Sequence, residues 1–295
     1  MAIERGGIGD QSTRASGLRG EFLVPYEPRI FIFDSTEKVD ITATHIFKRQ
    51  VQRKPDSVLT LPTGSSPIPM LHGIVHEFQQ GEIDLSRVRI FNIDENWPLP
   101  RGHEGTYAYF MDHHLFKHVN IPENQRHIPR SWAEDPHHEA MEYERTLALY
   151  GPPDLTFAGL GPDTTCHIGF NEKGSDLHSR TRLVTLHPET IAANRNHFPN
   201  PEEATTQAVT QGVETLLETG QFVFIIKGPS KAWGVNRILT GPINSDAPGS
   251  FARYHPNVVV LLDTAAAAEL PQGVQESRFV RQDITSFIEQ LDQAA

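Results

Sequence analysis

The sequence predicts an α/β protein built on a doubly wound, mostly parallel β-sheet with helices on both faces. Short apolar runs such as 222–226 and 258–262 are typical of strands that are buried on both faces. These runs alternate along the chain with longer segments of helical periodicity, which is the order found in α/β folds. With 38% hydrophobic and 21% charged residues among 295, the composition is that of a packed globular chain rather than a disordered one.

The individual elements follow from these patterns in chain order. Residues 1–28 show little pattern and are expected to form an N-terminal extension ahead of a single domain over 29–295. Asp34 and Ser35 precede the first helical segment, where either can cap it. Strands are expected at 29–33, 57–61, 87–94, 155–161, 182–186, 221–228 and 257–263. Helices are expected at 36–53, 67–80, 106–119, 136–151, 201–220, 229–241 and 281–294.

Composition excludes several classes of protein. One cysteine cannot make an internal disulfide framework, and no apolar run approaches the ~20 residues that span a bilayer. Residues 1–19 lack the apolar core of a secretory signal, so a cytoplasmic protein is expected. A net charge of −11 without a basic run argues against nucleic-acid binding. That charge still allows an anionic small molecule to be held by a few local donors.

Polar clusters follow four of the expected strands, at the point where each strand ends. They are Thr63–Ser66, Asp94–Glu95, Gly161–His167 and Gly228–Lys231. In an open parallel sheet, the ligand binds outside the carboxyl ends of the strands. The sequence therefore predicts that these four clusters meet in one site.

The first cluster lies in the segment "LPTGSSP", which joins a strand to a helix through small residues. Gly64 permits close backbone approach, the first helical turn offers free N–H groups to an anion, and Ser65 and Ser66 add hydroxyls. Thr63 opens the cluster. The segment lacks the Gly-Lys-Ser/Thr of a nucleotide P-loop. It predicts a phosphate site, and the alternative is an ordinary turn with a capping serine.

The second cluster, "FNIDEN", places Asp94 and Glu95 at a strand end. Adjacent side chains of an extended chain point to opposite sides, so only one of them can face a given site. A partly buried carboxylate has a raised pKa and can move a proton. The alternative interpretation is a helix-capping or solvated acid.

The third cluster, "GPDTTCHIGFNE", offers Asp163, His167 and Glu172. A histidine flanked by carboxylates can be oriented by one of them and have its pKa raised. The alternative interpretation is a polar surface loop. A nucleophilic pair of Cys166 and His167 is disfavoured, because adjacent residues seldom join side chain to side chain.

Three histidines, His113, His114 and His118, resemble metal ligands in their spacing. No glutamate completes a zinc motif beside them, so histidines that pack a helix or lie at the surface are favoured. No metal site is predicted.

Taken in order, the clusters resemble the glucosamine-6-phosphate deaminase (isomerase) family, which shares its fold with the 6-phosphogluconolactonases. The resemblance covers roughly residues 29–264. Its most specific part is "HIGFNE" followed by "SRTR", which points to the deaminase branch; the lactonases have a Thr-Ala-Ser run that is missing here. The other matching phrases are "LPTGSSP", "FNIDENWPLP", "TYAYFM", "FKHVNIP", "GLGPD", "TLHPETIAAN", "GVETLL" and "GPSKA".

The resemblance implies a Rossmann-like fold and no metal or nucleotide cofactor. It implies that an amino-sugar phosphate is opened, isomerised from aldose to ketose and deaminated to fructose-6-phosphate and ammonia. Carried over by position, Asp94 is the base that moves a proton between C2 and C1. His167 assists ring opening, and Asp163 and Glu172 hold that histidine.

For the substrate phosphate, the resemblance implies the Thr63–Ser66 loop and Lys231. The family has an arginine in "ANSR", where this chain reads "ANRNHF", with Asn196 at that position and Arg195 one place earlier. One step along a helix turns a side chain by about 100°. Arg195 is therefore a further candidate only if the local alignment slips.

Two other departures bear on the site. Residues 164–166 separate Asp163 from His167 where the family has one residue, so the turn must bulge or move one end by up to ~7 Å of contour. The allosteric phosphate site of the bacterial hexamers uses Arg-x-Lys, whereas Arg182 is followed by Leu183 and Val184. Regulation by N-acetylglucosamine-6-phosphate is therefore expected to be absent or weaker.

Three alternatives stay open at this point. The chain could hydrolyse 6-phosphogluconolactone with His167 activating water, bind a sugar phosphate as a sensor without turnover, or isomerise a different or unphosphorylated sugar. Hexamers and monomers both occur in the family, so homo-oligomerisation also stays open.

Overall fold

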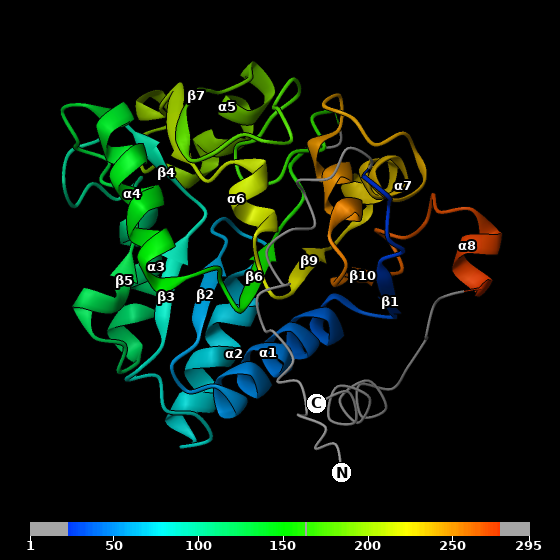
Figure 1. Cartoon of the computed structure of the whole chain (residues 1–295), viewed down its shortest axis with the longest axis horizontal. Coiled ribbons are helices and arrows are strands. Elements are labelled where there is room, and N and C mark those ends of the chain that lie inside the picture. The colour runs from blue at the N-terminus through cyan, green and yellow to red at the C-terminus, as the bar shows by residue number, and fades with distance from the viewer. Residues whose placement is uncertain (1–22, 163, 278–295) are drawn as a thin grey trace, which may run out of the picture.

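The computed structural model describes residues 23–162 and 164–277 and contains a large parallel sheet (Figure 1). Every neighbouring pair of its strands is parallel. In spatial order the strands are β1 (Arg29–Phe33), β10 (Val258–Asp263), β9 (Phe222–Ile226), β6 (Leu155–Ala158), β2 (Val58–Leu61), β3 (Arg89–Asn92) and β5 (Arg126–His127). The predicted α/β class with a doubly wound parallel sheet is confirmed.

Helices cover both faces of this sheet, because alternate strand residues enter different cores. Val223 and Ile225 of β9 pack in a core with α1 and α2, whereas Phe222 and Phe224 pack in a second core with α6 and α7. The helices are α1 (Thr36–Arg53), α2 (Ile68–Gln79), α3 (Tyr107–His114), α4 (Pro136–Tyr150), α5 (Pro188–Asn194), α6 (Val213–Leu217), α7 (Ala232–Thr240) and α8 (Gln272–Ser277).

A second, antiparallel sheet contains β4 (Asp94–Trp97), β8 (Gln207–Thr210) and β7 (Arg182–Thr185), in the order β4-β8-β7. Figure 1 shows β7 and α5 together at the top of the view. The strand expected over 87–94 is therefore two strands in different sheets. The chain leaves the large sheet at Ile93, whose N–H still donates to the Leu61 carbonyl at 3.2 Å.

The helix expected over 201–220 is wrong. The segment forms a 3-10 turn at Pro201–Glu203, strand β8 and the short helix α6. Strand pairing of β8 on both sides overrides the helical pattern here, since β4 and β7 flank it. A Cβ added at Gly212, between β8 and α6, would lie 2.0 Å from the Ser179 carbonyl oxygen, so this close approach requires glycine.

Other boundaries differ by less. The helix expected over 106–119 ends at His114 and continues as a 3-10 turn at Phe116–His118. The helix expected over 229–241 begins with a 3-10 turn at Pro229–Lys231. Helix α5, strand β5 and a 3-10 helix at Pro248–Tyr254 were not expected. The helix expected over 281–294 and most of the extension lie outside the described residues.

The order of the strands creates a switch point between β2 and β6. After β2 the chain adds β3 and β5 on one side, and then it returns to β6 and adds strands on the other side. In α/β proteins, ligands bind outside the carboxyl ends of the strands at such a point.

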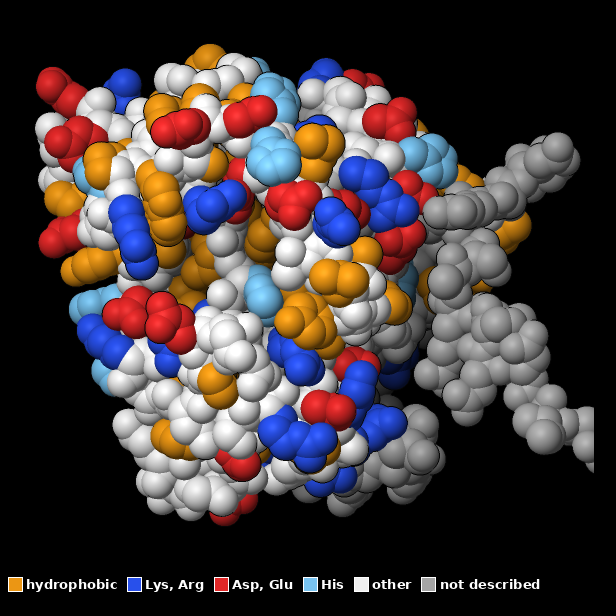
Figure 2. All heavy atoms as spheres, turned by 60° about the vertical axis from the view of Figure 1, so that its left-hand side comes forward, with side chains coloured by type: hydrophobic (Ala, Val, Ile, Leu, Met, Phe, Trp, Pro, Cys, Tyr) orange, Lys and Arg blue, Asp and Glu red, His pale blue; other side chains and the backbone are white. Residues whose placement is uncertain are grey.

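Charged side chains of both signs are mixed on the surface, as expected from a sequence without a basic run (Figure 2). Figure 2 shows acidic and basic side chains interspersed on the face that it presents, without a broad single-sign area. Within the described ranges, no helix is long and apolar enough to cross a membrane.

Candidate active site

Asp94 lies where the chain passes from the large sheet to the small one. It is the first residue of β4 and is paired in register with Thr210 of β8. The backbone carbonyl of Asp94 accepts a hydrogen bond from Asn92 Nδ2 at 3.1 Å. The residue is only 6% exposed, and burial raises the pKa of its carboxyl to about 8. A carboxyl group with that pKa can exchange a proton near neutral pH.

Glu95 points the other way and holds a helix. Its carboxylate accepts hydrogen bonds from the backbone N–H groups of Tyr107 at 2.7 Å and Ala108 at 2.9 Å, in the first turn of α3. Burial raises the pKa of Glu95 to about 8, and these N–H donors oppose the rise. The two adjacent acids thus separate as an extended chain requires, and Glu95 serves as a helix cap.

Gly169 brings the loop after β6 against Asp94. Its φ is +54°, and a Cβ there would lie 2.6 Å from Ile93 Cγ2 and 3.5 Å from Asp94 Oδ2. The "HIGFNE" loop therefore packs directly on the exit of β3, and Asp94 and the His167 loop belong to one site.

His167 is buried, at 7% exposure, with its ring lying over Gly161. Its Nδ1 lies 2.9 Å from Thr165 Oγ1, which also contacts the Pro162 carbonyl at 3.0 Å. Because that carbonyl can only accept, the hydroxyl donates to it and accepts from Nδ1–H, and this assigns the tautomer with a free lone pair on Nε2. Burial, with the nearby Lys231 charge, lowers the pKa of His167 to about 3.

The residues inserted before His167 form a tight turn. The N–H groups of Thr165 and Cys166 both donate to the Pro162 carbonyl, at 2.9 and 3.0 Å. Cys166 adopts a positive φ of 44° in this turn and is buried. Among the described residues, Thr165 is the hydrogen-bond partner of the His167 Nδ1 atom. Asp163 lies outside the described residues.

Glu172 approaches His167 but bonds elsewhere. Its Oε1 lies 3.9 Å from His167 Nδ1, which is beyond hydrogen-bond distance. Its carboxylate accepts from the backbone N–H of His187 at 2.6 Å and from the Thr190 hydroxyl, at the start of α5. Glu172 thus ties the loop that carries His167 to α5.

Gln211 connects two parts of the candidate site through hydrogen bonds, and the sequence pattern does not predict this role. It is fully buried, its backbone N–H donates to the Ile93 carbonyl at 2.8 Å, and its Nε2 donates to the Asn92 carbonyl at 2.9 Å. Its own carbonyl accepts from Asn171 Nδ2 at 2.8 Å. Gln211 therefore links the exit of β3 to the loop that follows His167.

The candidate phosphate residues lie around the start of α2. Gly64 has a φ of +97°, Ser65 is exposed, and Thr63 and Ser66 are partly buried. The N-cap residue of α2, Pro67, makes no side-chain capping bond, so this cap leaves the first N–H groups of the helix unbound. A Cβ at Gly64 would lie 3.8 Å from His197 Cε1, so the segment after α5 reaches this turn.

Two further candidates differ in their surroundings. Lys231 follows β9, and its Nζ donates to the Gly161 carbonyl at 2.8 Å, beside His167. Arg195 is exposed at the end of α5. The structure therefore places Lys231 next to the expected catalytic loop, whereas Arg195 keeps a freely solvated side chain.

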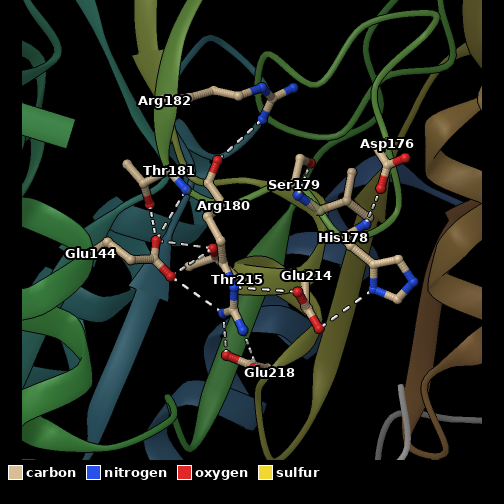
Figure 3. Close-up of polar contacts among 11 residues, drawn as sticks. Glu144, Asp176, His178, Ser179, Arg180, Thr181, Arg182, Glu214, Thr215 and Glu218 are labelled. Carbon is tan, nitrogen blue, oxygen red and sulfur yellow. Dashed lines mark hydrogen bonds and ion pairs between the residues drawn. The ribbon is translucent and has the colours of Figure 1, made fainter. Parts of the chain in front are cut away.

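Hydrogen bonds and ion pairs connect the "SRTR" segment to helices α4 and α6 (Figure 3). The Arg180 guanidinium lies among three glutamates, 2.5 Å from Glu218, 3.3 Å from Glu214 and 3.3 Å from Glu144. These carboxylates, chiefly Glu218, raise the pKa of Arg180. Since Glu144 belongs to α4 and Glu214 to α6, the motif anchors the small sheet to the body of the protein.

A cavity of about 810 Å³ lies against the loop that carries His167, and Asp94 is not among the residues that line it. Its lining includes Thr165, Glu172, Ser175 and Arg182. Arg182 donates to Asn171 Oδ1 at 2.8 Å and to Ser175 Oγ at 3.0 Å, so its guanidinium is already bound within the chain.

The histidines of α3 pack helices. His114 Nδ1 lies 3.1 Å from His72 Nε2 of α2, and His113 Nδ1 lies 3.1 Å from Lys117 Nζ. Within residues 23–162 and 164–277, no group of three His, Cys, Asp or Glu side chains is placed to hold a metal ion.

Comparison with known proteins agrees with this geometry. The family described as "Glucosamine-6-phosphate isomerases/6-phosphogluconolactonase" matches residues 36–261. The chain belongs to this family. A glucosamine-6-phosphate deaminase of Clostridium botulinum (strain Loch Maree / Type A3) is 38% identical over 242 residues, covering 82% of this chain and 98% of the relative. One from Thermoanaerobacter pseudethanolicus is 35% identical over 243 residues, covering 82% and 95%.

Solved structures of the family have the same fold. A monomeric glucosamine-6-phosphate deaminase superposes with a TM-score of 0.79 at 31% identity, over 82% of this chain and 99% of that one. The 6-phosphogluconolactonase from Trypanosoma cruzi gives a TM-score of 0.69 at 17% identity, over 84% and 98%. The second likeness concerns the fold alone.

Proposed function

We propose that this protein converts glucosamine-6-phosphate and water to fructose-6-phosphate and ammonia. The observation that carries the proposal is the placement of Asp94, a buried carboxyl at the exit of β3 that packs against the His167 loop. Burial raises the pKa of this carboxyl to about 8. The relatives named for this reaction, which are 35–38% identical over most of the chain, support the substrate.

In the proposed reaction His167 acts first. Its pKa of about 3 keeps the ring neutral, and the lone pair on Nε2 can accept the proton of the sugar O1 hydroxyl and return it to O5 as the ring opens. Thr165 holds the imidazole in the tautomer that this step needs. Glu172 positions the loop through α5.

Asp94 acts on the open-chain aldehyde. Its carboxylate removes the proton from C2 while O1 takes up a proton from water, which gives an enolamine. The same carboxyl then delivers its proton to C1 while the nitrogen loses an N–H proton to water, which leaves an imine at C2. Water adds to this imine, and the C–N bond breaks to give the ketone and ammonia. We propose that the Thr63–Ser66 turn and Lys231 hold the phosphate, with Arg195 as an unsupported further candidate.

The organisation of the chain completes the proposal. We propose one domain over 29–295 with an extension at 1–28, no metal or nucleotide cofactor and a cytoplasmic location. Lactone hydrolysis and binding without turnover are the alternatives. Neither requires a base with a pKa near neutrality beside C1 and C2, so Asp94 favours the deaminase.

The proposal is tested by incubating purified protein with glucosamine-6-phosphate and measuring ammonia and fructose-6-phosphate in parallel. The two products are expected in equal amounts. Release of neither product above a protein-free control would contradict it.

The pH dependence follows from Asp94. Its carboxylate is the reactive form, and a pKa of about 8 means that the neutral acid predominates below that pH. We therefore expect kcat/KM to fall as the pH is lowered through about 8. Since the substrate amine titrates too, the profile is compared with that of Asp94→Glu: a displaced midpoint assigns it to the enzyme, and two identical profiles would contradict the assignment.

Activation by N-acetylglucosamine-6-phosphate is expected to be absent. Arg182 is bound within the chain, and the neighbouring Val184 offers no charge to a phosphate. The KM for glucosamine-6-phosphate should change by less than about twofold in the presence of this compound. Val184→Lys, which restores Arg-x-Lys, serves as the comparison. A KM that falls several-fold in the unmodified protein would show that the site works without the lysine.

A further inference from the structure

Lys227 is a buried cation directly behind the turn that follows β2. It comes right after β9, and its side chain is only 11% exposed. Its Nζ lies 2.9 Å from the Ser66 carbonyl and 2.5 Å from Asp40 Oδ1. Asp40 belongs to α1, and its side chain is 10% exposed. One ammonium group thus joins a strand, a helix and the Thr63–Ser66 turn.

A buried ion pair is weak evidence for a contribution to fold stability. Taking two charges out of water costs free energy that their attraction seldom exceeds, and apolar residues of similar size often serve as well. Burial does raise the pKa of Asp40, while Lys227 lowers it. A buried pair that touches the backbone of a ligand-binding turn therefore calls for a role in that turn.

The positive charge near the Thr63–Ser66 turn suggests that this role is to attract the substrate phosphate. Lys231 donates to the Gly161 carbonyl, and Asn196 stands where an arginine would follow "Ala-Asn" in the family. A dianionic phosphate at Gly64–Ser66 would have Lys227 behind the turn, in a poorly solvated place where a charge is weakly screened. The cation also holds the Ser66 carbonyl, which belongs to this turn.

We propose that Lys227 is a positioning and specificity residue of the phosphate subsite, and that Asp40 limits its effect by neutralising part of its charge. This inference rests on the proposed function for the identity of the substrate. It requires opposite results from the two members of the pair, because removing the cation weakens the attraction for phosphate and removing the anion strengthens it.

The test titrates inorganic phosphate into the purified full-length protein by calorimetry, for the unmodified chain, Lys227→Met and Asp40→Asn. Lys227→Met is expected to weaken phosphate binding about tenfold, and Asp40→Asn to tighten it about threefold. The KM for glucosamine-6-phosphate should follow the same order, with kcat within about threefold. Lys227→Arg should restore binding.

Lys48 provides a matched control. Its side chain is 15% exposed and its Nζ lies 2.8 Å from Glu77 and 2.9 Å from Glu82, away from the turn. Lys48→Met should leave phosphate binding unchanged. A merely structural role for Lys227 and Asp40 predicts instead that both of their variants bind phosphate more weakly, and that result would overturn the inference.

The outcomes also separate the two proposals. Phosphate affinities that shift in opposite directions, in a protein that releases no ammonia, would support the subsite and contradict the deaminase. Normal ammonia release with equal phosphate affinity in all variants would contradict the subsite alone. If Lys227→Met fails to fold, Asp40→Asn keeps the lysine and still decides, since unchanged or weaker binding there contradicts the inference.

Discussion

Replacing Asp94 with asparagine is expected to lower the rate of ammonia release about a thousandfold, since a positioned proton-transfer group contributes 10²–10⁴. The amide keeps the size of the side chain but cannot take the C2 proton. Since we propose that the Thr63–Ser66 turn binds the substrate phosphate, KM should change little. Steady-state assays of ammonia against glucosamine-6-phosphate concentration give both values.

Glu95→Gln is the matched control for this variant. Glu95 is the adjacent residue, equally buried and with a pKa also raised to about 8, but its oxygens cap α3. Weakening this cap is expected to cost roughly 1 kcal/mol of stability and to leave most of the activity. An Asp94→Asn protein that keeps more than a tenth of the activity would rule out Asp94 as the base.

Gly161→Ala should be the next most damaging change. A Cβ at this position would lie 2.3 Å from Nε2 and 2.4 Å from Cδ2 of His167, both closer than any real contact. The ring must therefore move, and a displacement of about 1 Å in an active site can cost about 10²-fold in rate. We expect kcat to fall by about that factor while the protein stays folded, as followed by ammonia release and thermal unfolding.

Gly159→Ala tests whether this effect is specific. Gly159 lies two residues earlier in the same segment, and a Cβ added there meets nothing within 4 Å. Its variant should keep activity within about twofold. Equal activity in the two variants would mean that His167 needs no fixed place over Gly161.

The large sheet could be predicted because its strands are short, apolar and well separated. The run 222–226 becomes β9, and its residues are buried on both faces. A helix is wrongly predicted over 201–220. Strand β8 in this segment is stabilised by pairing with β4 and β7, which come from distant parts of the chain. The break at Ile93 also involves a distant segment, since Asp94 pairs with Thr210 of β8 in the small sheet.

The sequence could also predict that the polar clusters after the strands meet in one site. It could not predict the hydrogen bonds within that site. The rule for carboxyl ends brings Asp94 and His167 together, whereas the partner of His167 depends on how the inserted residues turn. Thr165 bonds to it in a turn where Cys166 adopts a positive φ, which no sequence rule for cysteine predicts. Lys227 is the one miss with a visible signal, being a charged residue directly after a buried strand.

The central claim is tested most directly by offering the same protein glucosamine-6-phosphate and 6-phosphogluconolactone, and comparing kcat/KM for ammonia release with that for lactone hydrolysis. We expect ammonia and fructose-6-phosphate in equal amounts, loss of both in Asp94→Asn, and lactone hydrolysis no faster than in buffer. Rapid hydrolysis of the lactone without ammonia from the amino sugar would contradict the account.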